Sequence, residues 1–295
     1  MAKTSPVAIR RASERPGEAT IVSVDRAFGI IELLADIAEG ASLADIARHL
    51  DVNKAIAVKL LATLERLWLI WRDDRVQRYN LTFRISNLGL RQLQTNRLLD
   101  QCAPALRVLA EQSGELVRLA IVEHNERITW VHAVAGTKRS LQIDPDYSLE
   151  VQLNTHAIAK AWLSTMPFER ALKLMLRQGI ASLTPRSKVM IDAIRADLHR
   201  TAREGFAISH EESELGVGAI AAPIMVASLA GTQECVGAVS LAAPTTRMGP
   251  AELENCAPAL IETVKRLGMI WPMKVHTSVS LAAAARPAMT VATKR

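Results

Sequence analysis

SLADIARHLDVNKAIAVKLLATL, residues 42–64, holds the clearest structural pattern in this 295-residue chain. Ser42 followed three residues later by Asp45 resembles a capping box, which is typical of a helix start. Apolar residues at helical spacing line one face of this short helix, and they recur in a second helix expected from residue 54 to 67. Residues 51–53 interrupt the pattern. Two short helices joined by such a turn predict a helix-turn-helix.

Two strand-like runs follow this pair of helices. They are LIWR at 69–72 and VQRYNL at 76–81, around a polar turn at 73–75. A hairpin directly behind a helix-turn-helix predicts a winged helix. Ahead of it, Ser23 is the expected N-cap of a first helix whose apolar residues recur every three or four positions.

Basic residues concentrate in the same part of the chain. Residues 48–97 hold ten Lys and Arg against four Asp and Glu. The body from 21 to 271 carries equal numbers of both signs, so the net charge of +6 lies numerically in the two tails. A basic segment within a neutral body favours an anionic partner such as nucleic acid.

The second half of the chain mixes helices and strands. Residues 83–113 indicate two helices that meet near Arg97–Asp100. Beyond them, strands are expected at 116–122, 128–134, 140–143, 219–228 and 234–242, and helices at 155–164, 168–176, 188–203 and 250–267. This order predicts an α+β domain with a mainly antiparallel sheet.

The expected organisation is therefore a disordered tail, a winged-helix domain, a linker helix, an α+β domain and a second disordered tail, at residues 1–20, 21–82, 83–97, 98–271 and 272–295. The spacing of Cys102, Cys235 and Cys256 fits neither a zinc site nor a set of disulfides, which favours a reducing, cytoplasmic setting. No apolar stretch reaches the ~20 residues of a membrane-spanning helix, so we expect no membrane association.

The exposed face of the second helix of the pair is the expected DNA contact. Its other face is used by core leucines, so Lys54, Ala55, Val58 and Lys59 should face outward, next to Asn53. The lysines can neutralise phosphates or reach base edges, and the two apolar residues can contact a thymine methyl group.

On the hairpin, Arg72, Arg75 and Arg78 are expected to contact phosphates or to lie in the minor groove. The alternative is a solvated basic face on a small helical domain.

Motifs for catalysis are absent from the sequence. There is no HExxH, no cysteine nucleophile motif and no glycine-rich phosphate loop. His210, Glu211 and Glu212, with nearby Glu214, could form a metal or acid–base cluster, or a polar loop. We expect no catalytic residue, no metal and no cofactor.

A ligand site in the second domain has its own pattern. Thr155–Lys160 opens a helix, and free backbone N–H groups at a helix start favour a carboxylate. The small side chains there would let a ligand approach closely. The alternative is simple helix packing, with Ala157 and Ala159 as spacers.

Taken together, the residues resemble the IclR family of transcriptional regulators, named for the isocitrate lyase regulator, from Ser23 to Trp271. The resemblance lies in SVDRA at 23–27, SLADIA at 42–47, Lys54 with LLATLE at 60–65, YNL at 79–81, AIAKA at 157–161, GFA at 205–207 with Glu211 and Glu212, IAAP at 220–223, and VSLAAP at 239–244.

The resemblance implies a winged-helix domain, a linker helix that helps dimerise, and a GAF-like domain that binds a small, often carboxylate-bearing metabolite. Such proteins act as homodimers or homotetramers on palindromic operators in double-stranded DNA beside catabolic genes. Carried over position by position, the effector pocket would be lined by Ala157, Ile158, Ser209, Ala219, Ser240 and Ala242.

Departures from the family pattern fall in both domains. Asp51 and Trp68 stand where glycine is usual, Ala55-Ile56 replaces a Ser-Thr pair, and Lys59 replaces an arginine. These changes remove hydrogen bonds to phosphate and bases, and Asp51 would repel phosphate, so operator affinity or preference should be unusual.

In the pocket, Ala159 replaces a glycine, and Ala219 and Ala242 stand where polar groups are common. The ligand is therefore expected to be more apolar than a short keto acid, for example an aromatic acid.

The sequence thus predicts a ligand-responsive transcriptional regulator. The alternatives are an enzyme that processes a small acid with His210, Glu211 or Glu212, and an architectural DNA binder without an effector.

Overall fold

The computed structural model describes residues 21–136, 141–145, 150–227 and 231–271. The chain divides into two compact units, Met1–Thr95 and Asn96–Arg295. The two tails that we expect to be disordered lie outside the described residues. Within the described ranges, no helix is both long and apolar enough to cross a membrane.

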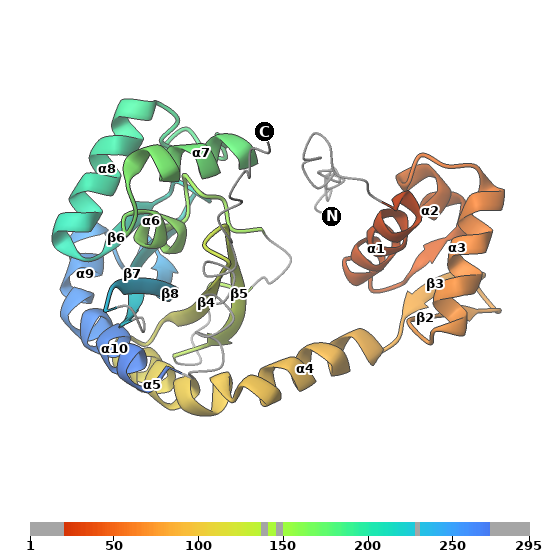
Figure 1. The fold of residues 1–295 in the computed structure, drawn as a ribbon, viewed down its shortest axis with the longest axis horizontal. Helices are drawn as coiled ribbons and strands as arrows, with labels where there is room; N and C mark the ends of the chain where they lie inside the picture. The colour runs from red at the N-terminus through yellow and green to blue at the C-terminus, as the bar shows by residue number, and fades with distance from the viewer. Residues whose placement is uncertain (1–20, 137–140, 146–149, 228–230, 272–295) are drawn as a thin grey trace, which may run out of the picture. The chain divides into compact units, whose positions relative to one another are not determined.

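The first unit is a helix-turn-helix followed by a β-hairpin (Figure 1). Its helices are α1 (Val22–Ala35), α2 (Leu43–His49), α3 (Lys54–Arg66) and α4 (Arg84–Asn96), and its strands are β1 (Ala41–Ser42), β2 (Ile70–Asp73) and β3 (Arg78–Leu81). Strand β3 lies between β1 and β2, and both pairs are antiparallel. The predicted helix-turn-helix is confirmed, and the β2–β3 hairpin is its wing.

Side-chain caps start both helices of the helix-turn-helix. The Ser42 hydroxyl accepts a hydrogen bond from the backbone N–H of Asp45 at 3.2 Å and donates to the Asp45 carboxylate at 2.6 Å, which confirms the predicted cap of α2. Asn53 caps α3, because its side-chain oxygen accepts the backbone N–H of Ile56 at 2.9 Å.

Apolar side chains from the helices and the wing form one core in this unit. It contains Ile30, Ile31, Leu34, Ala41, Ile46, Leu61, Leu64, Ile70 and Tyr79. The core residues that come from the helices have the helical spacing seen in the sequence. The start of the first helix, however, differs from the predicted start. The prediction that Ser23 is the N-cap is wrong, because α1 already begins at Val22.

Two exposed residues of this unit, Asp51 and Trp68, have left-handed backbone, with φ of 51° and 58°. Glycine adopts this conformation freely, whereas a side chain costs roughly 1–2 kcal/mol, and less for Asp. Trp68 directly follows Leu67, the C-cap residue of α3, a position at which glycine is favoured. The two departures from the family glycines therefore coincide with strained backbone.

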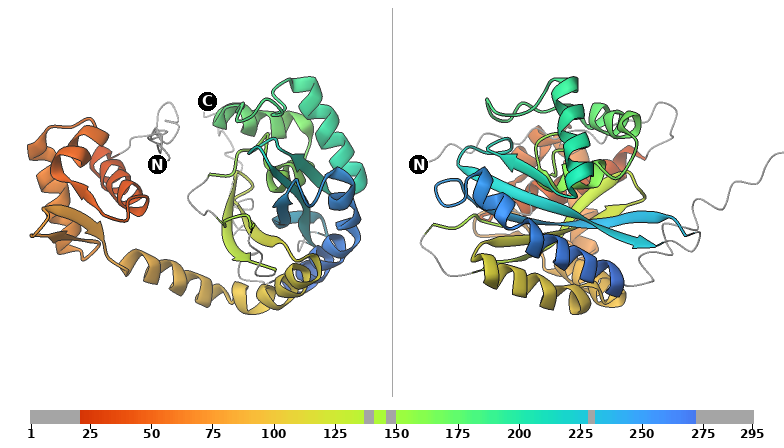
Figure 2. Two further views of the ribbon diagram at one scale, coloured as in Figure 1. Left: turned by 180° about the vertical axis from the view of Figure 1, so that it is seen from behind. Right: turned by 90° about the vertical axis from the view of Figure 1, so that its left-hand side faces the viewer.

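The second unit is an α+β domain built on a five-stranded antiparallel sheet of order β5-β4-β8-β7-β6 (Figures 1 and 2). Its strands are β4 (Leu116–Glu123), β5 (Arg127–Val134), β6 (Ala207–His210), β7 (Val217–Ala227) and β8 (Gln233–Pro244). Its helices are α5 (Leu98–Ser113), α6 (Ala157–Leu163), α7 (Phe168–Gln178), α8 (Ile191–Glu204), α9 (Pro250–Asn255) and α10 (Ala257–Ile270). The predicted α+β class with a mainly antiparallel sheet is confirmed.

Several boundaries differ from the sequence prediction. Residues 141–143 form no strand, so the strand expected at 140–143 is wrong for its described part, and Ser140 lies outside the described residues. So short a run needs a strand alongside it, and none of the described strands pairs with it. The final helix is broken at Cys256 into α9 and α10.

Helices cover both faces of the sheet (Figure 2). Helix α6 packs on β6, β7 and β8 on one face, whereas α5 and α10 contact each other on the other face. Ala120, Ala221 and Ala238 of the sheet belong to the same apolar cluster as Ala157 and Trp162 of α6. These small side chains let α6 lie close to the sheet.

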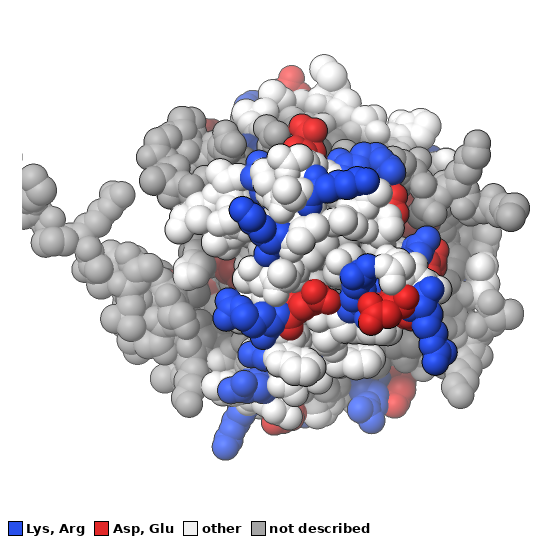
Figure 3. All heavy atoms as spheres, turned by 90° about the vertical axis from the view of Figure 1, so that its right-hand side faces the viewer, with Lys and Arg blue, Asp and Glu red and all other residues white. Residues whose placement is uncertain are grey.

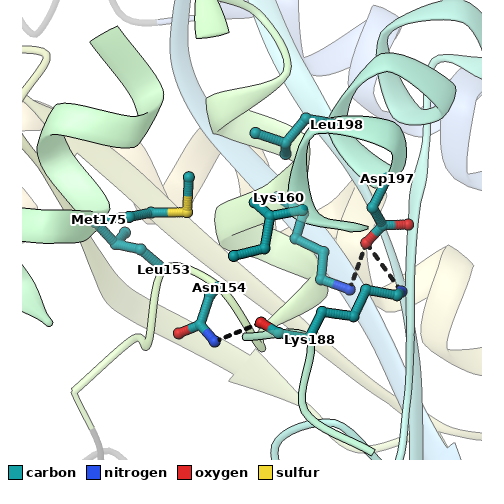
Figure 4. Close-up of a pocket in the computed structure, with 8 residues that line it drawn as sticks. Leu153, Asn154, Lys160, Met175, Lys188, Asp197 and Leu198 are labelled. Carbon is teal, nitrogen blue, oxygen red and sulfur yellow. Dashed lines mark hydrogen bonds and ion pairs between the residues drawn. The ribbon is translucent and has the colours of Figure 1, made fainter. Parts of the chain in front are cut away.

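A buried ion cluster joins α6 to α8 and to the loop after β6. Figure 4 shows its Lys160, Lys188 and Asp197. The Lys160 ammonium, on a side chain only 3% exposed, lies 2.8 Å from Asp197 Oδ2 and 2.6 Å from Glu212 Oε1. Lys188 Nζ approaches the same two oxygens at 3.0 and 2.8 Å. Each carboxylate therefore contacts two ammonium groups, which compensates the cost of burying it.

Replacing Trp68 with glycine should stabilise the first unit. The side chain is 73% exposed, so its removal loses little burial, while the left-handed strain disappears. We expect local stability at the end of α3 to rise by about 0.5–1 kcal/mol, seen as slower amide hydrogen exchange there. Arg66→Gly, inside the same helix, should instead lose about 1 kcal/mol. Faster exchange in Trp68→Gly would show that the indole contacts outweigh the strain.

Acid should destabilise the second unit through Asp197. Burial acts to raise the pKa of this carboxyl, but Lys160 and then Lys188 outweigh it and hold the pKa below the usual 3.8. Because the folded-state pKa is the lower one, the stabilisation is complete above about pH 4 and is lost as the pH falls through the folded value.

Asp197→Asn should therefore lower the free energy of unfolding at neutral pH by about 3 kcal/mol and flatten its dependence on pH below 4. Urea unfolding of the full chain across this pH range measures both effects. Asp192→Asn, on an exposed side chain of the same helix, is the control. If the free energy of unfolding falls equally steeply with decreasing pH in wild type and in Asp197→Asn, Asp197 is not the cause of the acid sensitivity.

Candidate DNA-binding face and ligand site

Helix α3 presents one face to solvent in its first two turns. Lys54, Ala55, Val58 and Lys59 are all exposed, and Val58 is 47% exposed although it is apolar. Asn53 is exposed as well, with its side-chain oxygen occupied by the helix cap. The structure thus brings the five predicted residues together. Such a face offers two cations for phosphates and apolar groups for a thymine methyl.

The three wing arginines have different surroundings. Arg72 lies over the ring of Tyr79, with its guanidinium carbon 5.7 Å from the ring centre. Arg78 donates to the carbonyl of Gly40 at 2.8 Å and is half-buried. Arg75 is exposed on the turn between the strands. Arg72 and Arg78 therefore also stabilise the wing, and Arg75 is the best placed to reach a phosphate.

Acidic side chains lie among these cations. Figure 3 looks onto the first unit and shows Asp and Glu between the Lys and Arg side chains. Asp74 Oδ1 lies 4.0 Å from Arg72 Nε on the wing, and Asp51 is exposed just before α3. The positive potential of this face is therefore weaker than the number of its lysines and arginines implies.

In the second unit, four predicted pocket residues lie on neighbouring strands of the face that α6 covers. Ser209 pairs with Ala219, and Ala219 pairs with Ala242. Ser240 pairs with Ala221, two residues further along β7. Residues opposite each other in antiparallel strands point to the same face, and so do residues two apart on one strand.

The two remaining predicted residues come from α6. Ala157 and Ile158 are buried at its start and belong to the apolar cluster on this same face. All six predicted residues are thus on or against one face of the sheet, which we call the ligand face.

Within the described residues, buried hydroxyl groups without hydrogen-bond partners occur on the ligand face and just before α6. Among the described residues, the side-chain oxygens of Ser209, Ser240 and Thr155 are buried and make no hydrogen bond. The two serines are 2% exposed and Thr155 is fully buried. Leaving such a group unsatisfied costs about 1–3 kcal/mol, which a polar ligand or water would recover.

An arginine that the sequence analysis does not select stands beside one of these hydroxyls. Arg118 pairs with Ser240 across β4 and β8, and its guanidinium carbon lies 4.1 Å from the centre of the Trp130 ring. The ring of His156 meets Trp130 edge to face, with centres 6.4 Å apart. The sequence does single out Arg118 in one way, because it is the charged residue within the otherwise apolar run 116–122.

His156 is neutral at neutral pH. Burial, followed by the charge of Arg118, lowers the pKa of this imidazole to about 4. Nδ1 of this ring lies 3.0 Å from the backbone nitrogen of Gln152 and 3.3 Å from its carbonyl oxygen, so Nδ1 can accept from the first or donate to the second, depending on the tautomer. His156 therefore adds no charge to this region at neutral pH.

The polar residues at the end of β6 are held in ion pairs. Glu212 belongs to the buried cluster, and Glu211 lies 2.8 Å from Arg186 Nη1, which is 3.2 Å from His210 Nδ1. Glu211 also accepts the backbone N–H of Gly216 at 2.8 Å. In the described part of the chain, no group of three or more His, Cys, Asp or Glu could hold a metal. These contacts favour the polar-loop interpretation.

Two pockets occur elsewhere in this unit. One surrounds the ion cluster (Figure 4) and is lined by Leu153, Asn154, Lys160, Met175, Lys188, Ile194, Asp197 and Leu198. The other lies beside α5 and is lined by Leu99, Asp100, Ala103, Pro104 and Arg107. Neither includes any of the six predicted residues.

Comparisons with known proteins agree across both units. Residues 23–74 match the model of the IclR helix-turn-helix domain, and residues 90–268 match that of the C-terminal domain of the bacterial transcriptional regulator IclR. The HTH-type transcriptional repressor AllR of Escherichia coli (strain K12) is 23% identical over 270 residues, which cover 89% of this chain and 97% of AllR.

Solved structures show the same fold. An IclR transcriptional regulator from Alicyclobacillus acidocaldarius superposes with a TM-score of 0.73 at 22% identity, covering 85% of this chain and 99% of that one. An IclR homologue from Microbacterium hydrocarbonoxydans, complexed with 4-hydroxybenzoate, gives 0.65 at 17% identity, covering 84% and 98%. With its helix-turn-helix, its antiparallel α+β domain and both family models matched, the chain belongs to the IclR family of transcriptional regulators.

Proposed function

We propose that this regulator binds a double-stranded DNA operator through α3 and the wing, and that a small carboxylate-bearing metabolite at the ligand face controls the binding. The observation that carries the DNA-binding part is the exposed face of α3, where Lys54 and Lys59 flank two apolar side chains. That face has no packing role in the core of its own unit.

The two kinds of contact would have separate tasks. Lys54, Lys59 and Arg75 would hold the phosphate backbone, while Ala55 and Val58 would read a thymine methyl in the major groove. The regulator would act as a homodimer or homotetramer on a palindromic operator beside catabolic genes, as the family resemblance implies. Asp51 would weaken the contact, so affinity should be lower than a glycine at this position would allow.

The ligand part rests on the buried hydroxyls of Ser209, Ser240 and Thr155, which make no hydrogen bond to any residue that the structure describes. An aromatic acid is the favoured ligand, because alanines line the ligand face and Trp130 packs against its apolar cluster. The relative from Microbacterium hydrocarbonoxydans complexed with 4-hydroxybenzoate supports this class. Control would be a population shift, in which the ligand binds one DNA-binding state better than another.

Changing Lys54 and Lys59 together to alanine should weaken operator binding about tenfold or more, because two phosphate contacts are lost. The dependence of log K on log salt should become shallower by ~1.8. A gel-shift titration at several salt concentrations, on DNA from upstream of the regulator's own gene, measures both quantities.

Lys173→Ala with Lys265→Ala is the matched control, since it removes two exposed lysines from the second unit. It should bind the operator as the wild type does. Wild-type affinity and salt dependence in the Lys54/Lys59 variant would show that α3 is not the recognition helix.

A further inference from the structure

We propose that Arg97 is a two-state hinge through which ligand control reaches the DNA-binding unit. In one state α4 and α5 are separate helices on either side of this residue. In the other state Arg97 is helical, and the two join into one helix from residue 84 to residue 113. This inference rests on the proposed ligand control and names the part of the chain that transmits it.

The first step is the backbone of Arg97. This single exposed residue separates Asn96, the last residue of α4, from Leu98, the first residue of α5. Its φ of 50° and ψ of 20° are left-handed. A side chain makes this conformation unfavourable, and arginine is among the better helix-forming residues. The break between the helices therefore exists against the local preference of the chain.

The second step is what one continuous helix would gain. At a break, the last carbonyl groups of one helix and the first N–H groups of the next have no partner within their own helix. If Arg97 becomes helical, the N–H groups of residues 98–100 come within reach of the carbonyl groups of residues 94–96. No side-chain cap at the start of α5 would be lost. The first bond of α5, from the N–H of Gln101 to the carbonyl of Arg97, is long at 3.3 Å.

The third step is the packing on the two sides of Arg97. Leu98 and Cys102 are at most 1% exposed, so α5 is anchored in the interior of the second unit. Helix α4, in contrast, has no buried residue within its bounds of Arg84–Asn96. The first compact unit ends at Thr95, two residues before Arg97. The left-handed residue thus lies where the anchored part of the chain begins, which is the expected place for a hinge.

The fourth step is how each partner can favour one state. Helix α5 contacts β4, and β4 pairs with β8, which carries Ser240 and Ala242 of the ligand face. The half-sites of an operator have a fixed spacing, so DNA accepts the DNA-binding units in one arrangement. A ligand and an operator that each bind one state better are coupled through the population of that state.

Spin labels at Arg91→Cys and Glu111→Cys test the two states in the full-length chain. Both positions are exposed, and 20 residues of one straight helix would hold them ~30 Å apart. Cys256→Ser removes the half-buried cysteine. Burial raises the pKa of Cys102 and of Cys235 to about 12, so these thiols should not react with the label.

Dilution with unlabelled chain removes the distances between copies. We expect two populations of distances, one at ~30 Å and one shorter. Operator DNA should change their ratio by about fivefold or more, and so should 4-hydroxybenzoate as the probe acid. The two shifts should be in the same direction if the acid strengthens operator binding, and in opposite directions if it weakens it.

Substitutions at Arg97 should move the ratio both ways. Arg97→Gly should favour separate helices by about tenfold, because glycine adopts the left-handed conformation freely and is a poor helix former. Arg97→Ile should favour the continuous helix, because a β-branched residue disfavours a positive φ. Operator affinity should therefore change in opposite directions in the two variants.

Two further variants are the controls. Arg97→Ala removes the charge and keeps the Cβ atom, so it should behave as the wild type does. Gln92→Gly weakens α4 at an exposed position inside the helix and should leave the ratio unchanged.

The outcomes separate the hinge from the proposed function. Equal distances in wild type, Arg97→Gly and Arg97→Ile would overturn the hinge, and so would weaker operator binding in both variants. If the acid changes operator affinity while the ratio stays constant, the hinge is wrong and ligand control stands. If DNA shifts the ratio and no acid changes either quantity, ligand control is wrong and the hinge responds to DNA alone.

Discussion

Keeping the charge of Lys160 in the interior is the constraint on which the second unit depends. An ammonium on a side chain that is 3% exposed is tolerated only beside carboxylates, and Asp197 and Glu212 supply them from α8 and from the loop after β6. These contacts fix α6 relative to the sheet. Helix α6 in turn carries Ala157 and Ile158 over the strands, so the ion cluster sets the geometry of the ligand face.

The ligand face differs from the ion cluster in how its polar groups are satisfied. In the cluster, each carboxylate has at least two cationic partners. On the ligand face, the buried hydroxyls of Ser209 and Ser240 make no hydrogen bond within the described part of the chain. The ion pairs of the cluster stabilise the fold whether or not a ligand is present, whereas the unsatisfied hydroxyls are suited to a polar ligand.

The helix-turn-helix could be predicted from the sequence because its signals are local. The Ser42 cap and the helical spacing of core residues depend on neighbours within one or two turns. Ser23 shows the limit, since a good capping residue does not set a helix start when the preceding backbone is already helical.

The ligand face could be predicted only in part, since its geometry comes from strand pairing. The family resemblance supplied Ser240 and Ser209, but the neighbour of Ser240 is Arg118, on a strand far away in the sequence. Neither strand order nor register can be read from periodicity, because alternation assigns a residue to a face without naming its partner. The partners of Lys160 were missed for the same reason.

In the proposed mechanism, a small acid bound in the second unit changes the affinity of the first unit for DNA. The most direct measurement is the dissociation constant of the wild-type operator complex, with and without a saturating concentration of the acid that binds the protein most tightly. We expect a change of about 5- to 150-fold, and a change by the same factor in the affinity for the acid when operator DNA is present. An operator affinity that is the same with and without the bound acid would contradict it.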